Sequence, residues 1–131
     1  MLNKAIINLV LTVTLIAASL PLVAQNEPPE AVQVTVPGLL VEANQAYLAK
    51  DNLAFRKAME GLHKLRPYNG QYMYQLVVAH ALLDEKDQAY SLMLHMQQQG
   101  LSYDFSKIDS TDNIKDTEVF EYVNDLMVLA G

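Results

Sequence analysis

The pattern of apolar and polar residues divides the chain into three parts. Residues 5–24 form an apolar run without charge, residues 25–38 are polar and contain three prolines, and from Leu39 onward apolar residues recur every three or four positions. That spacing is typical of amphipathic helices that bury one face. The pattern therefore predicts an N-terminal segment with a separate role, a linker over residues 25–38, and an all-α domain over residues 39–131.

Four apolar stripes mark the helices at the start of this domain. Pro67 ends the second helix, because proline cannot continue the hydrogen-bond ladder and restricts the residue before it. Gly100 follows the fourth helix, where glycine favours a left-handed cap. The third helix is expected over roughly residues 71–83. In chain order the stripes consist of Leu39, Ala43, Ala46 and Tyr47; of Phe55, Ala58, Met59 and Leu62; of Met73, Leu76, Val77 and His80; and of Ala89, Leu92, Met93 and Met96.

These helices form two copies of one pattern. Moving the first copy along the chain so that Leu39 falls on Met73 superposes the two copies without a gap, and it brings the turn at residues 50–52 onto the turn at residues 84–86. A helical hairpin that repeats every ~34 residues has the spacing of a tetratricopeptide repeat. The pattern predicts repeats at about residues 36–69 and 70–103, with the segment "RPYNG" (Arg66 to Gly70) as their junction.

A third copy of the pattern is incomplete. A second shift by the same period brings Val123, Leu126, Met127 and Ala130 into register, whereas "DFSKIDSTDNI" (Asp104 to Ile114) is too polar for a good first helix. We therefore expect a degenerate third unit over residues 104–131. Asp116 or Thr117 would cap its last helix, whose inward face includes Phe120, Val123 and Met127. A terminal unit is expected to present a polar outer side.

At these residues the chain resembles the tetratricopeptide repeat (TPR) family, over about Leu39 to Gly131. Small or apolar residues stand at the packing positions of the repeat, and Pro67 fits the proline at its end. The chain departs from the family pattern at Glu42 and Phe55, which stand where Leu and Ala are usual, and it has no Trp. The resemblance implies antiparallel helical hairpins stacked as a short right-handed solenoid.

A bacterial subset of the family is similar in its last unit. There the second repeat ends in "GL-x-Y-D" and an acidic stretch leads to a final helix that contains Phe; here these are "GLSYD" (Gly100 to Asp104) and "DSTDNIKDTEVFEYV". Such a module looks like what precedes lactonase-like β-propeller domains in some exported proteins. No propeller sequence follows Gly131, so we expect no enzymatic half in this chain.

The family binds extended peptides in a groove lined by the first helices of its repeats, and the resemblance implies the same use here. Tyr offers an apolar face with a polar tip, and Asn or Gln can hydrogen-bond a peptide backbone. The alternative is that the groove positions only cover the surface or pack on a further helix. Aligning the repeats gives the expected groove residues Leu40, Asn44, Tyr47, Leu48, Gln71, Tyr74, Val78 and Leu82.

One specialised groove does not fit the residues. Family members that bind chaperone tails clamp a terminal carboxylate with Lys and Asn one helical turn apart. Asn44 is present, but Leu40 stands four residues before it, and the second repeat has Tyr74 and Val78. Without a cation the carboxylate would lose its charge-assisted hydrogen bonds, so we do not expect this clamp.

Charge and composition exclude several classes of function. The chain has 15 acidic and nine basic residues, a formal charge of −6, and no Cys. Its basic residues are spread along the sequence, whereas nucleic-acid binding needs them clustered. No His pair has i, i+4 spacing with a supporting carboxylate, and no phosphate loop or nucleophile motif occurs. We therefore expect no nucleic acid, no metal and no cofactor.

The N-terminal segment, residues 1–24, predicts a secretory signal peptide. Lys4 gives a basic start, Ala5 to Ala24 is an uncharged run, and the chain then becomes polar. This is the order of an export signal, and we expect cleavage after Ala24 and a periplasmic or secreted protein. The alternative is an uncleaved membrane anchor, because such a run just spans about 30 Å of hydrocarbon. Polar residues within it, such as Asn8 and Thr12, favour the cleaved signal.

Together these features predict an exported, non-catalytic interaction module that binds a peptide or a partner domain in its groove. Fewer than three full repeats are marginal for a free solenoid, so self-association is an alternative to a different partner. A second hypothesis is an accessory module or subunit of a separately encoded exported hydrolase of the lactonase type. A third is a membrane-tethered envelope scaffold, if residues 1–24 are retained.

Overall fold

A computed structural model describes residues 33–129, and these residues are helical, without strands. The all-α prediction is therefore confirmed for this part of the chain. The expected signal peptide and most of the expected linker lie outside it. The elements, in chain order, are α3 (Val36–Leu48), α4 (Asn52–Leu65), α5 (Gly70–Leu82), α6 (Lys86–Gln98), the 3-10 helices η1 (Phe105–Lys107) and η2 (Asp109–Ile114), and α7 (Glu118–Leu129).

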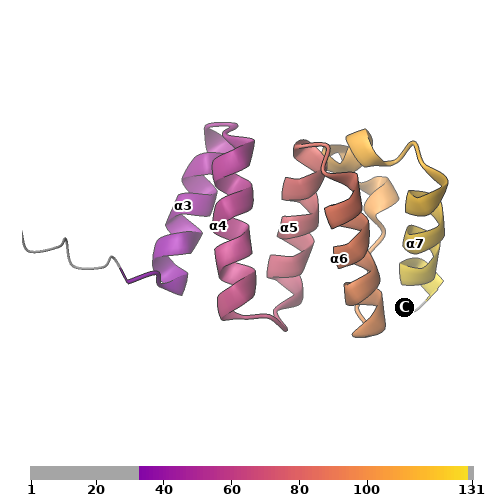
Figure 1. The fold of residues 1–131 in the computed structure, drawn as a ribbon, viewed down its shortest axis with the longest axis horizontal. Helices are drawn as coiled ribbons and strands as arrows, with labels where there is room; N and C mark the ends of the chain where they lie inside the picture. The colour runs from indigo at the N-terminus through magenta and orange to yellow at the C-terminus, as the bar shows by residue number, and fades with distance from the viewer. Residues whose placement is uncertain (1–32, 130–131) are drawn as a thin grey trace, which may run out of the picture. The chain divides into compact units, whose positions relative to one another are not determined.

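Each α-helix packs on the next one along the chain. Contacts join α3 to α4, α4 to α5, α5 to α6, and α6 to α7, and η2 packs on α5. Short turns join α3, α4, α5 and α6, so that each of these helices runs antiparallel to the next one in the row (Figure 1). Helix α7 runs parallel to α6, because residues 99–117 first return to the start of α6, where Lys86 pairs with Asp116. Because a helix in this row has neighbours on two sides, it must bury apolar residues on more than one line of its surface.

The period of the sequence reappears in the backbone. Helix α5 repeats α3 at both ends, with Gly70 in the place of Val36 and Leu82 in the place of Leu48. The turns that follow the two helices repeat as well: Lys50 and Asp84 both have φ of 56°, the left-handed region that a non-glycine residue adopts only at some cost. The next N–H closes each turn on a carbonyl near the end of the helix, at 2.9 Å in both copies.

Local signals set the ends of the helices. The Thr35 hydroxyl accepts the N–H of Gly38 and caps α3, with Pro37 in its first turn. The helix therefore starts at Val36, and the last three residues of the expected linker belong to it. Helix α4 ends at Leu65, just before Arg66 and Pro67, and Asn69 caps α5 through the N–H of Tyr72. Gly100 has φ of 79°, as its cap position after α6 requires.

The predicted apolar stripes form the core, except that Tyr47 of the first stripe is 50% exposed. Phe55 and Met93 have exposed fractions of only 4% and 0%. Leu48 is the exception to the repeat alignment, because it is exposed although its counterpart in the second copy, Leu82, is half-buried. The other aligned positions are buried in both copies: Leu39, Ala43, Ala46, Phe55, Ala58, Met59 and Leu62, and then Met73, Val77, His80, Ala89, Leu92, Met93 and Met96.

The third unit lacks its first α-helix, as its polarity predicts. Two 3-10 helices occupy residues 105–114, and η2 lies against α5 where a first helix would stand. Ser, Thr, Asp and Asn compete for backbone hydrogen bonds and so favour caps and turns over long helices. The Thr111 hydroxyl is fully buried and lies within hydrogen-bond distance of the carbonyls of Phe105 and Ile108, at 2.6 and 2.7 Å.

A buried asparagine joins this segment to α7. The side chain of Asn124 is 4% exposed, and its Oδ1 accepts the N–H of Phe105 at 2.9 Å. Its Nδ2 donates to Oδ1 of Asp104 at 3.0 Å, and the same carboxylate accepts the N–H of Ser106. One side chain thus satisfies the start of η1 and holds it against the last helix.

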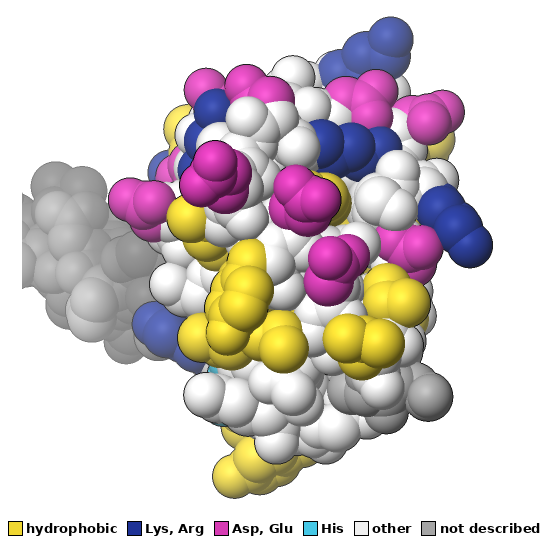
Figure 2. All heavy atoms as spheres, turned by 90° about the vertical axis from the view of Figure 1, so that its right-hand side faces the viewer, with side chains coloured by type: hydrophobic (Ala, Val, Ile, Leu, Met, Phe, Trp, Pro, Cys, Tyr) yellow, Lys and Arg dark blue, Asp and Glu magenta, His cyan; other side chains and the backbone are white. Residues whose placement is uncertain are grey.

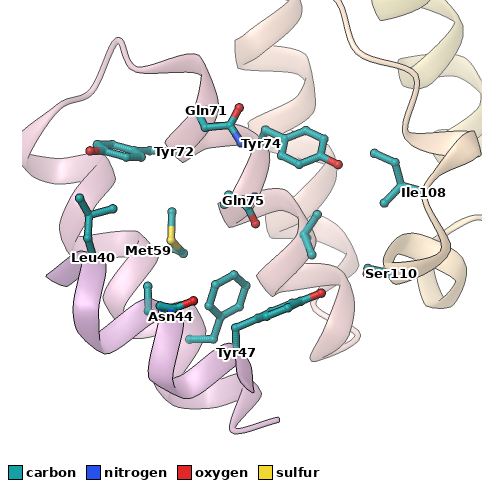
Figure 3. Close-up of a pocket in the computed structure, with 13 residues that line it drawn as sticks. Leu40, Asn44, Tyr47, Met59, Gln71, Tyr72, Tyr74, Gln75, Ile108 and Ser110 are labelled. Carbon is teal, nitrogen blue, oxygen red and sulfur yellow. The ribbon is translucent and has the colours of Figure 1, made fainter. Parts of the chain in front are cut away.

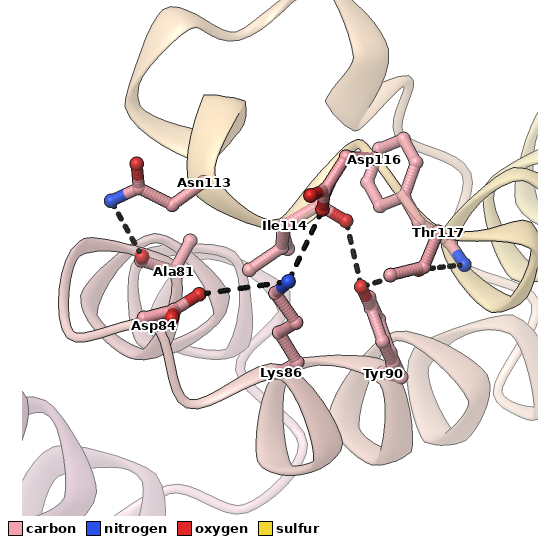
Figure 4. A network of polar contacts seen from close by, with 9 residues as sticks. Ala81, Asp84, Lys86, Tyr90, Asn113, Ile114, Asp116 and Thr117 are labelled. Atoms are coloured by element: carbon pink, nitrogen blue, oxygen red, sulfur yellow. Dashed lines mark hydrogen bonds and ion pairs between the residues drawn. The ribbon is translucent and has the colours of Figure 1, made fainter.

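A second set of polar contacts joins the segment to α6 (Figure 4). The hydroxyl of Tyr90 donates to the carbonyl of Ile114 at 2.7 Å. The same hydroxyl lies 2.6 Å from the hydroxyl of Thr117. The Thr117 hydroxyl also accepts the N–H of Phe120. Thr117, one of the two residues expected to cap α7, is therefore its cap. Lys86, one turn before Tyr90 on α6, pairs with Asp116 at 3.2 Å (Figure 4).

We predict that Asn124→Ala destabilises the fold by about 1–3 kcal/mol, because it leaves the buried N–H of Phe105 without its acceptor. The free energy of unfolding from urea denaturation measures the loss. Asn113→Ala is the matched control, since Asn113 is exposed and makes only a long contact of 3.4 Å to the carbonyl of Ala81. The control should stay within about 0.5 kcal/mol of the wild type, and equal losses in both variants would contradict the assignment.

Candidate functional site

A hollow of about 450 Å³ opens between α3 and α5. Figure 3 shows side chains from both helices around it, with Met59 of α4 between them and Ile108 and Ser110 at the edge that η2 forms. It is lined by Leu40, Ala43, Asn44 and Tyr47 of α3, Phe55 and Met59 of α4, Gln71, Tyr72, Tyr74, Gln75 and Val78 of α5, and Ile108 and Ser110 of the third unit.

The hollow follows from the way the helices pack. Both α3 and α5 pack on α4, and α4 therefore holds them apart. Phe55 and Met59 fill the space between the two helices from the α4 side, and both are nearly fully buried although they contact the hollow. The floor is thus part of the core, and its position is fixed by the same packing that holds the repeats together.

Aromatic rings form much of the wall. The ring centroids of Tyr47 and Phe55 lie 5.4 Å apart in a tilted arrangement. Tyr74 stacks on Phe105 of η1 at 5.5 Å and lies 5.2 Å from Tyr103. Such offset and tilted pairs are favourable geometries for aromatic rings. They support the exposed ring of Tyr47 and the half-buried ring of Tyr74 from behind and so keep both in place at the hollow.

The polar groups of the hollow are neutral. Asn44, Gln71 and Gln75 supply amides, Ser110 a hydroxyl, and no Asp, Glu, Lys, Arg or His of the described residues lines it. Within the described part of the chain the three amide side chains make no hydrogen bond to another residue, so both their donors and their acceptors are free for a ligand. An amide of this kind matches the alternating N–H and C=O groups of a peptide backbone.

Six of the eight expected groove residues lie in this hollow. They are placed there by helical spacing, because Leu40, Ala43, Asn44 and Tyr47 follow one face of α3 at i, i+3, i+4 and i+7. Leu48 is turned away from that face and is 72% exposed. Leu82 is packed partly into the core and does not line the hollow either.

Some lining residues are not among the expected ones. Gln75 belongs to the same face of α5 as Gln71, Tyr74 and Val78, so helical spacing alone could have found it. Tyr72 is not among the groove positions that the alignment of the two repeats gives. Ile108 and Ser110 come from the segment after α6, and no period in the sequence indicates that it folds back on α5.

The nearest charged cluster lies outside the hollow. The guanidinium of Arg56 pairs with Glu60 at 2.9 Å and with Glu85 at 3.3 Å, and the hydrogen bond with Glu60 raises the pKa of Arg56. Glu85 also lies 3.1 Å from Nδ1 of the buried His80. This network joins the turn before α6 to α4. Its contact with Glu85 gives the buried His80 a structural role, which agrees with the place of His80 in the apolar stripe of its helix.

Neither a metal cluster nor a membrane span is found in the described part of the chain. Among residues 33–129 there is no group of three His, Asp or Glu side chains placed to hold a metal ion. None of the helices that the structure describes has the length and the apolar character needed to cross a membrane. The apolar run at residues 5–24 lies outside the described residues.

No model of a known protein family matches the chain, and neither a curated protein nor a solved structure does. The TPR resemblance thus rests on the period of the sequence and on the matching period of the backbone.

The third unit, which forms one edge of the hollow, contains a hydrogen-bonded carboxylate at Asp104. Hydrogen bonds from Asn124 and Ser106 lower the pKa of Asp104 below its ordinary value of 3.8. A carboxyl group whose pKa is lower in the folded state stabilises the fold above its unfolded pKa, and it loses this effect as the pH falls through the folded pKa. Asp104 directly precedes Phe105, which supports Tyr74.

We predict that Asp104→Asn lowers the free energy of unfolding at neutral pH, and that the difference from wild type shrinks as the pH falls below 3.8. Denaturant titrations at a series of pH values measure it. Asp109→Asn is the control, because its exposed carboxylate has no hydrogen bond or ion pair to a described residue. A difference that stays constant from neutral to acid pH would show that the charge of Asp104 is not involved.

Proposed function

We propose that this chain is a short TPR-like module that binds an extended peptide, or an extended segment of a partner protein, in the hollow between α3 and α5. The single observation that carries the proposal is the lining of that hollow, which combines apolar and aromatic side chains with unengaged amides. The repeated hairpins at residues 36–65 and 70–98 support a right-handed TPR-like solenoid, in which such a hollow is the concave groove.

The lining indicates the chemistry of the occupant. Exposed tyrosine and leucine side chains at Tyr47 and Leu40 favour an apolar side chain of the peptide. Asn44, Gln71 and Gln75 would hydrogen-bond its backbone, since a backbone needs both donors and acceptors from its receptor. A charged side chain would be desolvated there without an opposite charge, which is unfavourable. The proposed ligand is therefore an uncharged, extended stretch.

The energetics favour a few anchoring contacts. In protein interfaces a minority of residues carries most of the binding free energy, and Tyr is enriched among them. Tyr47 is 50% exposed, and its ring is held in place by Phe55, so little conformational entropy remains to be lost on binding. We propose Tyr47 and Tyr74 as the principal anchors.

We propose a non-catalytic role, because the groove is lined by amides, hydroxyls and apolar groups and no acid–base pair stands beside them in the described residues. Export belongs to the proposal as well. It rests on the sequence of residues 1–24, with the basic start and uncharged run of a signal peptide. The partner is then a protein of the same compartment.

The test is site-specific crosslinking in the cell. A photoreactive amino acid replaces Asn44 inside the groove, and crosslinked partners are purified and identified. We predict that one defined partner is crosslinked. Tyr47→Ser, combined with the photoreactive residue at position 44, should reduce the crosslinked product by about tenfold, because an anchoring contact is lost. The photoreactive residue at Leu48, four positions along α3 from Asn44 but outside the groove, should give little product.

Tyr68→Ser is the matched control for Tyr47→Ser, because Tyr68 is 84% exposed in the turn between α4 and α5. It should leave the crosslinked product unchanged. The proposal fails if the reagent at Asn44 yields only a scatter of abundant proteins. It also fails if Tyr47→Ser and Tyr68→Ser behave alike.

A further inference from the structure

The outer side of α7 carries an apolar stripe that the fold leaves uncovered. Val119, Tyr122 and Leu129 are exposed, with fractions of 66% for Tyr122 and 81% for Leu129, and Leu126 is half-buried between them. Figure 2 shows this end of the domain, where apolar side chains run across the centre of the face and acidic side chains lie beside them. A terminal unit is expected to present a polar outer side, and α7 meets that expectation only in part, because apolar and acidic residues share its outer side.

The spacing of the stripe is that of a helix that packs against another helix. Val119, Tyr122, Leu126 and Leu129 follow each other by three, four and three positions, which is the spacing of a heptad seam. At about 100° per residue these four positions fall within about 80° of arc on α7. A separate set of residues, which includes Phe120, Val123 and Met127, faces the core. The helix therefore has two apolar sides, and α6 covers one of them.

Acidic residues border the stripe on the side away from the core. Glu118, Glu121 and Asp125 are exposed, and at helical spacing they occupy the arc next to the stripe. None of them forms an ion pair with another residue of the described chain, and α7 contains no Lys or Arg. A helix that packs on the stripe would thus meet a row of three unpaired negative charges at its edge.

This charge pattern decides between the possible occupants. In a second copy packed antiparallel on the same stripe, the acidic rows of the two α7 helices would lie opposite each other, and like charges facing each other are unfavourable. Each chain also has a formal charge of −6. A helix with Lys or Arg beside its apolar seam would instead pair with these carboxylates.

We infer that the outer face of α7 is a docking surface for a basic amphipathic helix of a partner protein. The partner would pack its apolar seam on Val119, Tyr122 and Leu129 and place its cations beside Glu121 and Asp125. This surface is distinct from the groove between α3 and α5 and does not depend on the proposed function of that groove. The chain would then present two binding surfaces, one neutral and one acidic.

The test uses a synthetic helical peptide with leucine along one face and lysine beside it. It is titrated into the purified full chain, and binding is followed by calorimetry and by the shifts of assigned backbone amides. We predict that amides of α7 shift, and that Tyr122→Ser weakens binding by about tenfold or more, as loss of a central contact does. The double variant Glu121→Lys, Asp125→Lys should weaken it similarly and should gain affinity for a peptide with glutamate in place of lysine.

Matched variants separate this surface from others. Tyr68→Ser and Tyr47→Ser each remove an exposed tyrosine elsewhere and should leave the affinity within about twofold of the wild type, because distant sites act independently. A peptide of the same composition with its leucines scattered around the helix should bind much more weakly than the amphipathic one.

Several results would overturn the inference. They are the absence of binding by the basic peptide, equal binding of the glutamate or scattered peptide, and shifts confined to the groove. A dimer of the wild-type chain in sedimentation equilibrium that Tyr122→Ser dissociates would also overturn it, because the occupant of the stripe would then be a second copy.

Discussion

The fold depends on burial between successive helices. Helices α4, α5 and α6 each pack on an element outside their own hairpin, so neighbouring hairpins stabilise each other. Five of the buried residues are methionines: Met59, Met73, Met93, Met96 and Met127 are at most 3% exposed. Their unbranched side chains adapt to irregular gaps between helices. The repeat period of these contacts sets the positions of α3 and α5 on either side of α4 and, with them, the hollow.

The end of the row is made by a different means. The segment after Gly100 has too few apolar residues to form another helix, and it is held by side-chain hydrogen bonds to the backbone. Thr111, Asn124 and Tyr90 reach buried carbonyl or N–H groups, which would be costly to leave without partners. The result is a compact wall that supports Tyr74 through Phe105. Polar contacts thus complete a groove whose floor is held by apolar packing.

The period made most of the helices predictable. The stripes at i, i+3, i+4 and i+7, Pro67 and Gly100 give the helices and their ends, and the same spacing places six groove residues on two helical faces. The fold of residues 104–114 was not predictable, because it depends on contacts such as Asn124 with Phe105 that leave no period in the sequence. Ile108 and Ser110 were missed for this reason. Leu48 does not line the groove, although the repeat alignment predicts it. The alignment gives the position of a residue along its helix but does not show how far around the helix the groove extends.

Charge is divided unevenly between the surfaces of the domain. Arg56 of α4 pairs with Glu60 and Glu85, and Lys86 at the start of α6 pairs with Asp116. The groove has no charge, and the carboxylates of α7 have no partner among the described residues. A solvent-facing helix needs no apolar stripe for its own stability, and leaving one exposed favours aggregation. Acidic residues beside the stripe oppose association between identical copies while leaving it open to a partner of opposite charge, so both features of α7 have the same physical explanation.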